Sequence, residues 1–205
     1  MMEKEISRNR QTTEQVLLDA VRELVEESGF ENVGVNAVAT RAGVSKMLIY
    51  RYFGSLDGLI AAYIRQHDFW INFDEELPDR QHVGEFVKRM FRGQVALLRE
   101  NYTLNRLYRW ELTTDNAVIR ELREKREAKG CWLVDAVSRL TGHPRKEIAV
   151  VATLINTSIC YLTLLAENCE EYNGIRIQED AGWRQLEEGI DTLIDLWLSK
   201  KIKSE

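Results

Sequence analysis

The sequence predicts an all-α protein in which a small amino-terminal helical domain precedes a larger helical domain. Apolar residues recur at helical spacing almost throughout, beginning with Leu17, Ala20, Val21, Leu24 and Val25. Only 2 prolines and 12 glycines occur in 205 residues, and no alternating strand pattern of useful length is found. With 44% hydrophobic and 30% charged residues, the chain is typical of a globular protein with a sizeable core.

The amino-terminal third is predicted to consist of short helices joined by tight turns. Thr12 or Thr13 can cap the first helix, which ends at Ser28 and Gly29. Two short helical pieces follow, and Ser55 can cap a longer fourth helix.

The later helices are longer, which sets them apart from the first third. After a connector over residues 77–82, the helical period predicts helices over 83–100, 103–112, 116–140, 144–170 and 181–200. Asn173-Gly174 is a turn signal before the last of them. We therefore expect a small domain over residues 1–65 and a larger helical domain over residues 66–205.

The segment from Gly34 to Phe53 has the pattern of a helix-turn-helix. Gly43 can adopt a positive φ at low cost, as a sharp turn between two packed helices requires. Ser45 is a good cap for a second short helix over residues 46–52, in which Ile49 and Phe53 face inward. A tightly packed helical corner with no binding role would have the same periodicity.

Charge distinguishes these two interpretations. The protein carries a net charge of −5, yet the segment between Asn32 and Leu56 contains Arg41, Lys46 and Arg51 and no acidic residue. Because attraction to phosphate adds up over the cations that reach the backbone, this segment is the place where duplex DNA would bind.

These residues resemble the DNA-binding domain of the TetR (AcrR-type) family of bacterial transcriptional regulators. The resemblance runs from about Thr13 to Ile64, and its most specific parts are the segments 42–46 and 50–53, AGVSK and YRYF. It implies a second helix that enters the major groove of an operator. The DNA-binding residues that the resemblance implies are Asn36, Ser45, Lys46, Met47, Leu48, Tyr50, Arg51 and Tyr52.

Within that set the resemblance implies different roles. Ser45 would cap the recognition helix, Tyr50 and Tyr52 match positions that touch phosphate, and Asn36 matches a position that reaches a base edge. The chain also departs from the family pattern. Gly34 replaces the usual Thr or Ser and Leu56 the usual Lys, so fewer phosphate contacts and a weaker salt dependence are expected.

The larger domain is expected to bind a small molecule. Aromatic residues concentrate after residue 66, where they form either ordinary core or an apolar pocket with a few polar groups. The candidate ligand-binding residues are Tyr108, Arg109, Trp110, Trp132, Asn156 and Cys160. Arg109 either meets an anionic head group or pairs with a carboxylate such as Glu111, and Asn156 either lines a cavity or bonds across a dimer.

Two apolar stripes predict a homodimer, with an intramolecular core as the competing interpretation. The spacing 4, 3, 4 in the last helix is heptad-like, and the helix before it carries a second stripe. Two recognition helices that read half-sites about 34 Å apart require two-fold symmetry. The candidate dimer residues are Ile155, Ile159, Leu162, Leu186, Ile190, Leu193 and Trp197.

The segment 148–166 contains no charged residue and is long enough to be considered as a membrane span. Asn156 and several Thr and Ser residues interrupt it, which favours a helix buried against another protein surface. The charged start of the chain lacks the apolar core of a signal peptide, and Cys131, Cys160 and Cys169 are an odd number without metal-site spacing. We therefore expect a cytoplasmic protein without a membrane partner; a redox-sensing cysteine is the less favoured alternative to an inert thiol.

No sequence signature of catalysis is found. The chain lacks HExxH, GxSxG, Walker and dinucleotide-binding patterns, and its three histidines are scattered. We expect no enzyme activity, no cofactor and no metal. The favoured function is a homodimeric regulator, more specifically a repressor, that binds a palindromic DNA operator and is released by an apolar or amphipathic small molecule. The alternative is a helical small-molecule-binding or adaptor protein that no longer binds DNA.

Overall fold

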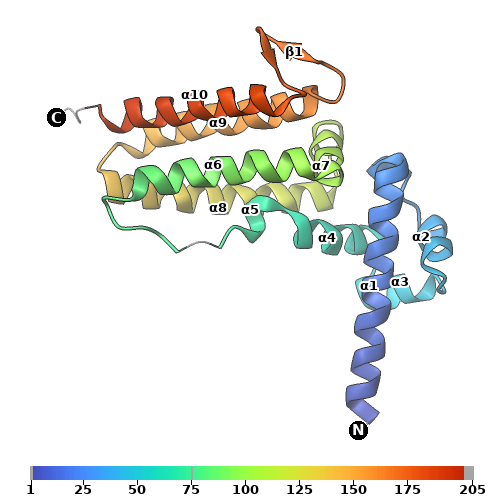
Figure 1. Cartoon of the computed structure of the whole chain (residues 1–205). Coiled ribbons are helices and arrows are strands. Elements are labelled where there is room, and N and C mark those ends of the chain that lie inside the picture. Colours follow the sequence, from blue (N-terminus) through green and yellow to red (C-terminus); the bar gives the residue numbers. More distant parts are fainter. Residues whose placement is uncertain (1, 75, 201–205) are drawn as a thin grey trace. The chain divides into compact units, whose positions relative to one another are not determined.

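The computed structural model describes residues 2–74 and 76–200, with residues 2–9 described by their backbone alone (Figure 1). The amino-terminal elements are α1 (Met2–Ser28), the 3-10 helix η1 (Phe30–Asn32), α2 (Val35–Ala42), α3 (Met47–Phe53), α4 (Leu56–His67) and α5 (Phe69–Asn72). The later elements are α6 (Val83–Glu100), α7 (Tyr102–Thr113), α8 (Ala117–Thr141), α9 (Arg145–Leu165), β1 (Glu171–Tyr172), β2 (Ile175–Arg176) and α10 (Asp180–Leu198). The expected all-α class is confirmed.

The chain divides into two compact units, and neither is a single continuous segment. The first unit comprises residues 1–72 and 102–125, and the second comprises residues 73–101 and 126–205. The boundary expected at residue 65 therefore falls inside α4, and α7 joins the amino-terminal helices. Helix α8 begins in the first unit and continues into the second.

Helix α1 is the centre of the first unit. Its apolar stripe is buried, with Leu17, Val21 and Val25 fully covered, and it packs against α2, α4, α7 and η1. The helix ends at Ser28, as expected, because Gly29 follows with a positive φ of 85°. The expected cap at Thr12 or Thr13 is wrong, since the helix already begins at Met2 and both threonines lie inside it.

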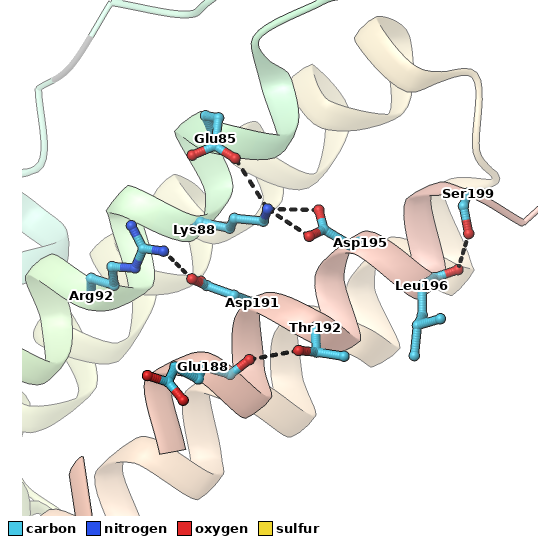
Figure 2. A network of polar contacts seen from close by, with 9 residues as sticks. All are labelled: Glu85, Lys88, Arg92, Glu188, Asp191, Thr192, Asp195, Leu196 and Ser199. Atoms are coloured by element: carbon cyan, nitrogen blue, oxygen red, sulfur yellow. Dashed lines mark hydrogen bonds and ion pairs between the residues drawn. The ribbon is translucent and has the colours of Figure 1, made fainter. Parts of the chain in front are cut away.

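In the second unit, α6 packs against both α9 and α10. Polar contacts reinforce the α6–α10 contact, as Figure 2 shows. The largely buried Lys88 places its Nζ 2.7 Å from Asp195 and 3.1 Å from Glu85, and Arg92 pairs with Asp191. The hydrogen bonds to Asp195 and Glu85 raise the pKa of Lys88, so its ammonium stays charged.

The later helices start and end close to the predicted residues, with one exception. Helix α9 ends at Leu165 instead of extending to residue 170. A two-stranded antiparallel hairpin, β1–β2, follows, and its turn contains Asn173 and Gly174, both with positive φ. The turn signal is thus confirmed. The hairpin leads into α10, whose Trp183 donates its indole N–H to the carbonyl of Ile177 at 2.7 Å.

Candidate nucleic-acid interface

The turn between α2 and α3 is closed by main-chain hydrogen bonds. Gly43 is left-handed, with φ 65° and ψ 28°, and its N–H and that of Val44 donate to carbonyls at the end of α2. Helix α3 begins at Met47, whose N–H donates to Ser45 Oγ at 3.4 Å, and the Ser45 carbonyl accepts from the N–H of Leu48 at 3.0 Å. The expected use of Gly43 for the turn is confirmed. The cap position of α3 is Lys46, which makes no side-chain cap hydrogen bond, so the expected cap Ser45 lies one residue earlier, and its Oγ accepts the bond from Met47.

Helix α3 has one fully buried side chain, and several of its other side chains are exposed to solvent. Ile49 is 0% exposed, whereas Met47 is 65% exposed and Tyr50 46%. Lys46 and Arg51 are exposed as well, and Leu48 and Tyr52 are half-buried. The inward orientation predicted for Ile49 is confirmed, whereas Phe53, also predicted to face inward, is only half-buried.

Glycine also determines how closely α4 approaches the end of α3. A Cβ built on Gly58 would lie 2.0 Å from the carbonyl oxygen of Phe53, so any side chain there would push the two helices apart. The N–H of Gly58 donates to Ser55 Oγ at 3.0 Å, which confirms Ser55 as the cap of α4. The role of Gly58 escaped the sequence analysis, because a contact with a neighbouring backbone leaves no periodic signal.

The helix-turn-helix has less uncompensated positive charge in the folded protein than its own sequence predicts, because a neighbouring helix supplies acidic partners. Arg41 donates two hydrogen bonds to Glu27 of α1, at 2.6 and 2.8 Å, and one to Glu23 at 3.2 Å. The interpretation of Arg41 as part of an uncompensated basic segment is therefore wrong. Lys46 and Arg51 remain exposed on or next to α3.

A third cation beside α3 comes from α1. The guanidinium of Arg10 lies 5.4 Å from the ring centroid of Tyr52, and that of Arg51 lies 5.9 Å from the same ring. Tyr52 thus holds two guanidinium groups near one another by cation–π contacts. Arg10 also pairs with Glu14 at 2.7 Å. The sequence analysis missed Arg10 because it started the first helix after this residue.

Helix α7 is packed directly on the amino-terminal helices. Trp110 stacks on Phe30 with ring centroids 5.0 Å apart and planes inclined by 14°, and Thr103 donates its hydroxyl to Glu26 of α1 at 3.2 Å. Tyr63 of α4 lies beside Phe30, and burial raises the pKa of its phenol to about 12. One face of the half-buried Trp110 is thus occupied by Phe30, and the assignment of this residue to a ligand site stays a prediction.

Comparison with known proteins agrees with this geometry. Residues 17–63 match the model of a family described as bacterial regulatory proteins, tetR family. The amino-terminal domain is therefore similar to the amino-terminal domain of that family. Comparison with curated proteins finds no match.

Solved TetR structures extend the likeness to the remainder of the chain. A TetR-like transcriptional regulator from Rhodococcus sp. RHA1 has 19% sequence identity and a TM-score of 0.61, over 92% of this chain and 97% of that chain. A second TetR transcriptional regulator from Rhodococcus sp. RHA1 has 18% identity and a TM-score of 0.53, over 96% and 99%. The chain therefore has the fold of a TetR-family transcriptional regulator.

The remaining candidate ligand residues fall into both units. Tyr108 is half-buried and Arg109 exposed on α7 in the first unit. In the second unit Trp132 is 41% exposed, with the ammonium of Lys129 4.7 Å from its ring. The structure does bring Asn156 and Cys160 together, around the amide of a residue that the sequence analysis did not single out, Gln94 of α6.

The candidate dimer residues of helices α9 and α10 point in different directions. Ile155 and Ile159 are 5% and 1% exposed, so they belong to the core of their own subunit, and their assignment to an interface is corrected. The ring of Trp197 lies against the buried His143, with centroids 4.6 Å apart and planes inclined by 35°. Leu162, Leu186 and Ile190 are half-buried and Leu193 is 58% exposed.

The exposed apolar side chains of these helices are largely different ones, namely Val150, Leu154 and Tyr161 of α9 and Leu193 and Leu196 of α10, which are 55–65% exposed. Helix α9 is long and apolar enough to cross a membrane, with a mean hydropathy of 2.0 in its most apolar window, of which 22% is buried. In residues 2–74 and 76–200, no group of three His, Cys, Asp or Glu side chains is placed to hold a metal ion.

Proposed function

We propose that this protein is a homodimeric transcriptional regulator, more specifically a repressor, that binds a palindromic operator through α3 and is released by a small molecule. The observation that carries the proposal is the exposure of α3. Ile49 holds the helix in place while Met47, Tyr50 and Arg51 stay available to a groove. A helix-turn-helix protein reads base edges with the start of its second helix, which is where these side chains lie.

The exposed polar groups fit a DNA backbone. Lys46 and Arg51 supply exposed cations, whereas Arg10, although it lies beside the ring of Tyr52, is paired with Glu14. Tyr50 can donate its hydroxyl to a phosphate. Because Arg41 is neutralised by Glu23 and Glu27, we expect it to support the fold of this domain instead of binding DNA.

The second copy of the chain is the partner that fits α9 and α10. Each of these helices leaves large apolar side chains exposed, including Leu154 at 65% and Leu196 at 64%. Large contiguous apolar patches are rare on monomeric proteins, so we expect these side chains to be covered by a partner. A two-fold dimer would cover them and would also supply the paired recognition helices that a palindrome requires. The same burial accounts for the apolar character of α9 without a membrane.

Helices α7 and α8 offer a route from effector to DNA. Helix α7 contacts α1 and η1 of the amino-terminal domain, and α8 runs from the first unit into the second. An effector that binds one arrangement of the second unit more tightly would shift the population toward that arrangement. Release requires that this arrangement space the two recognition helices wrongly for the operator.

Operator binding is tested by fluorescence anisotropy on DNA from upstream of the protein's own gene, over a series of salt concentrations. We expect saturable binding that weakens with salt, with two subunits per site. Unspecific DNA of the same length is the control. Equal or absent binding to both DNAs at every salt concentration would contradict the proposal and favour the adaptor function, for which the capping of α2 by Gly34, without a side-chain hydrogen bond, is a structural argument.

A further inference from the structure

Gln94 is the most unusual polar residue in the second unit. It lies in the middle of α6, is 0% exposed, and is surrounded in its own helix by the buried Met90, Phe91, Val95 and Leu98. A glutamine amide has two donor hydrogens and a carbonyl acceptor, and burying them without partners is costly. Such a residue in a helical core therefore needs an explanation.

The hydrogen-bond partners of Gln94 satisfy its amide nitrogen but not its amide oxygen. Its Nε2 donates to Asn156 Oδ1 at 2.6 Å and lies 3.5 Å from Cys160 Sγ. Its Oε1, by contrast, is buried and accepts no hydrogen bond. Asn156 and Cys160 are one helical turn apart on α9, so the three side chains form one cluster where α6 packs against α9.

The surroundings of the cluster restrict what can satisfy that oxygen. An amide oxygen accepts hydrogen bonds, so the missing partner is a donor. The α9 segment 148–166 contains no charged residue, and a charged group brought against it would be desolvated without a counter-ion. A neutral hydroxyl or amide N–H meets both conditions.

We propose that Gln94, Asn156 and Cys160 form the polar end of the effector site, and that the effector is a neutral molecule with a hydroxyl or amide donor on an apolar body. This inference rests on the proposed function in assigning the ligand to an effector role. Binding of the donor replaces an unsatisfied carbonyl by a hydrogen-bonded one, and the apolar body contacts the surrounding side chains of α6 and α9.

Ligand pairs that differ in the donor alone test the inference. The probes are primary alcohols from hexanol to dodecanol, each compared with its methyl ether and with the carboxylate of equal chain length. Binding to the full chain is followed by tryptophan fluorescence and by protection of Cys160 from iodoacetamide, with Cys131 and Cys169 as internal references in mass spectrometry. No DNA is present, so failure of this test and failure of operator binding are separate results.

For the unaltered protein we expect the best alcohol to bind about tenfold more tightly than its ether, the effect of one buried hydrogen bond, and more tightly than the carboxylate. Gln94→Leu should bind alcohol and ether equally, and Gln81→Leu, which changes an exposed glutamine of the same unit, should keep the difference. Gln94→Met serves the same purpose if the leucine variant does not fold, as judged by circular dichroism.

Three results would overturn the inference. One is equal affinity of the unaltered protein for alcohol and ether, or a preference for the carboxylate. Another is a preference for alcohol that survives in both Gln94 variants. The third is the absence of binding and of Cys160 protection for every alcohol in the series.

Discussion

Helices α3 and α9 both present side chains to solvent, but their sequences differ in how well they indicate which side faces outward. In α3 the inward residue Ile49 is apolar and two outward residues, Tyr50 and Arg51, are polar, so the pattern identifies the buried face. In α9 the inward Ile155 and the outward Leu154 are equally apolar. A helix that is apolar on all sides has two faces to bury. Its hydrophobic period therefore does not show which residues pack in the core of the same chain and which contact a partner.

The largest expected effect comes from placing a charge on the apolar surface of α10. Leu193→Asp would bury one uncompensated carboxylate per subunit in the proposed dimer, which costs on the order of several kcal/mol and raises the dissociation constant by about a hundredfold or more. Sedimentation velocity at micromolar concentration should show monomers, and operator binding should be lost with the dimer.

Leu112→Asp is the matched control for this variant. Leu112 is 76% exposed on α7, so the same substitution there should leave a dimer. A dimeric Leu193→Asp, or dissociation of both variants, would contradict the assignment of the exposed apolar side chains of α10 to a subunit interface.

The next effect separates two arginines of the helix-turn-helix. Arg51 is exposed on α3, whereas Arg41 is bonded to Glu27 and Glu23. Arg51→Ala should weaken operator binding by about 10- to 100-fold, the range for a lost base or phosphate contact. Arg41→Ala should change the affinity by about twofold at most, because a cation that is already paired has little net charge to offer a phosphate.

Anisotropy titrations at several salt concentrations measure both variants. The salt dependence should fall for Arg51→Ala and stay unchanged for Arg41→Ala. Equal losses of affinity in the two variants would mean that Arg41 separates from Glu23 and Glu27 when the protein binds DNA. The ion pairs of the free protein would then be absent from the complex.

A third prediction concerns α7 as part of the first unit. Trp110→Ala removes the ring that stacks on Phe30 and should lower the free energy of unfolding by about 2 kcal/mol, less than for a fully buried tryptophan because Trp110 is half-buried. Trp132→Ala, at a 41% exposed position of α8, is the control and should cost less. Urea unfolding followed by circular dichroism compares the two, and an equal cost would argue against α7 as a structural support of the amino-terminal domain.

Local signals in the sequence predicted the parts of the fold that depend on neighbouring residues. Gly43 at the turn, Ser55 at the start of α4 and the Asn173-Gly174 turn act through contacts with residues at most five positions away, so a short stretch of sequence contains both partners. The bounds of α6 were predicted for a similar reason, since its stripe is strongly amphipathic.

The parts that the sequence did not predict depend on contacts between distant segments. Arg41 lies in a stretch without acids, yet its partners Glu23 and Glu27 come from the preceding helix. Trp110 covers Phe30 from 80 positions along the chain. Gln94 gave no signal because a single polar residue in an amphipathic helix is ordinary until its burial is known.

A smaller effect is expected at the start of α2. Gly34 has an extended backbone, φ −119°, and a Cβ there would meet no atom within 4 Å, so a side chain can be added without strain. Gly34→Ser should supply the missing cap, which stabilises the domain by a few tenths of a kcal/mol, about 0.3. It should also add a phosphate contact and tighten operator binding about twofold. Thermal unfolding and anisotropy measure the two effects, and unchanged or weaker binding would show that this end of α2 stays away from the backbone.

The smallest effect tests the role assigned to Arg41 by pH. Its hydrogen bonds lower the pKa of Glu27 below the usual range of a glutamate, about 4.3. Because the pKa is lower in the folded state, the contribution of Glu27 to stability is present above the unfolded pKa and is lost as the pH falls through the folded one. Glu27→Gln removes this titration, and Arg41→Ala removes its cause, so both variants should lose less stability than the unaltered protein between neutral and acidic pH.

Urea unfolding at a series of pH values measures these slopes, and the double variant should match either single one, since one pair is responsible. A slope in Arg41→Ala equal to that of the unaltered protein would mean that the pair does not form in solution. Arg41 would then be available to DNA, and the contrast with Arg51 would disappear. The pH dependence of stability and the operator titration thus address the same question, because pairing with Glu27 reduces the net positive charge that Arg41 offers to a phosphate.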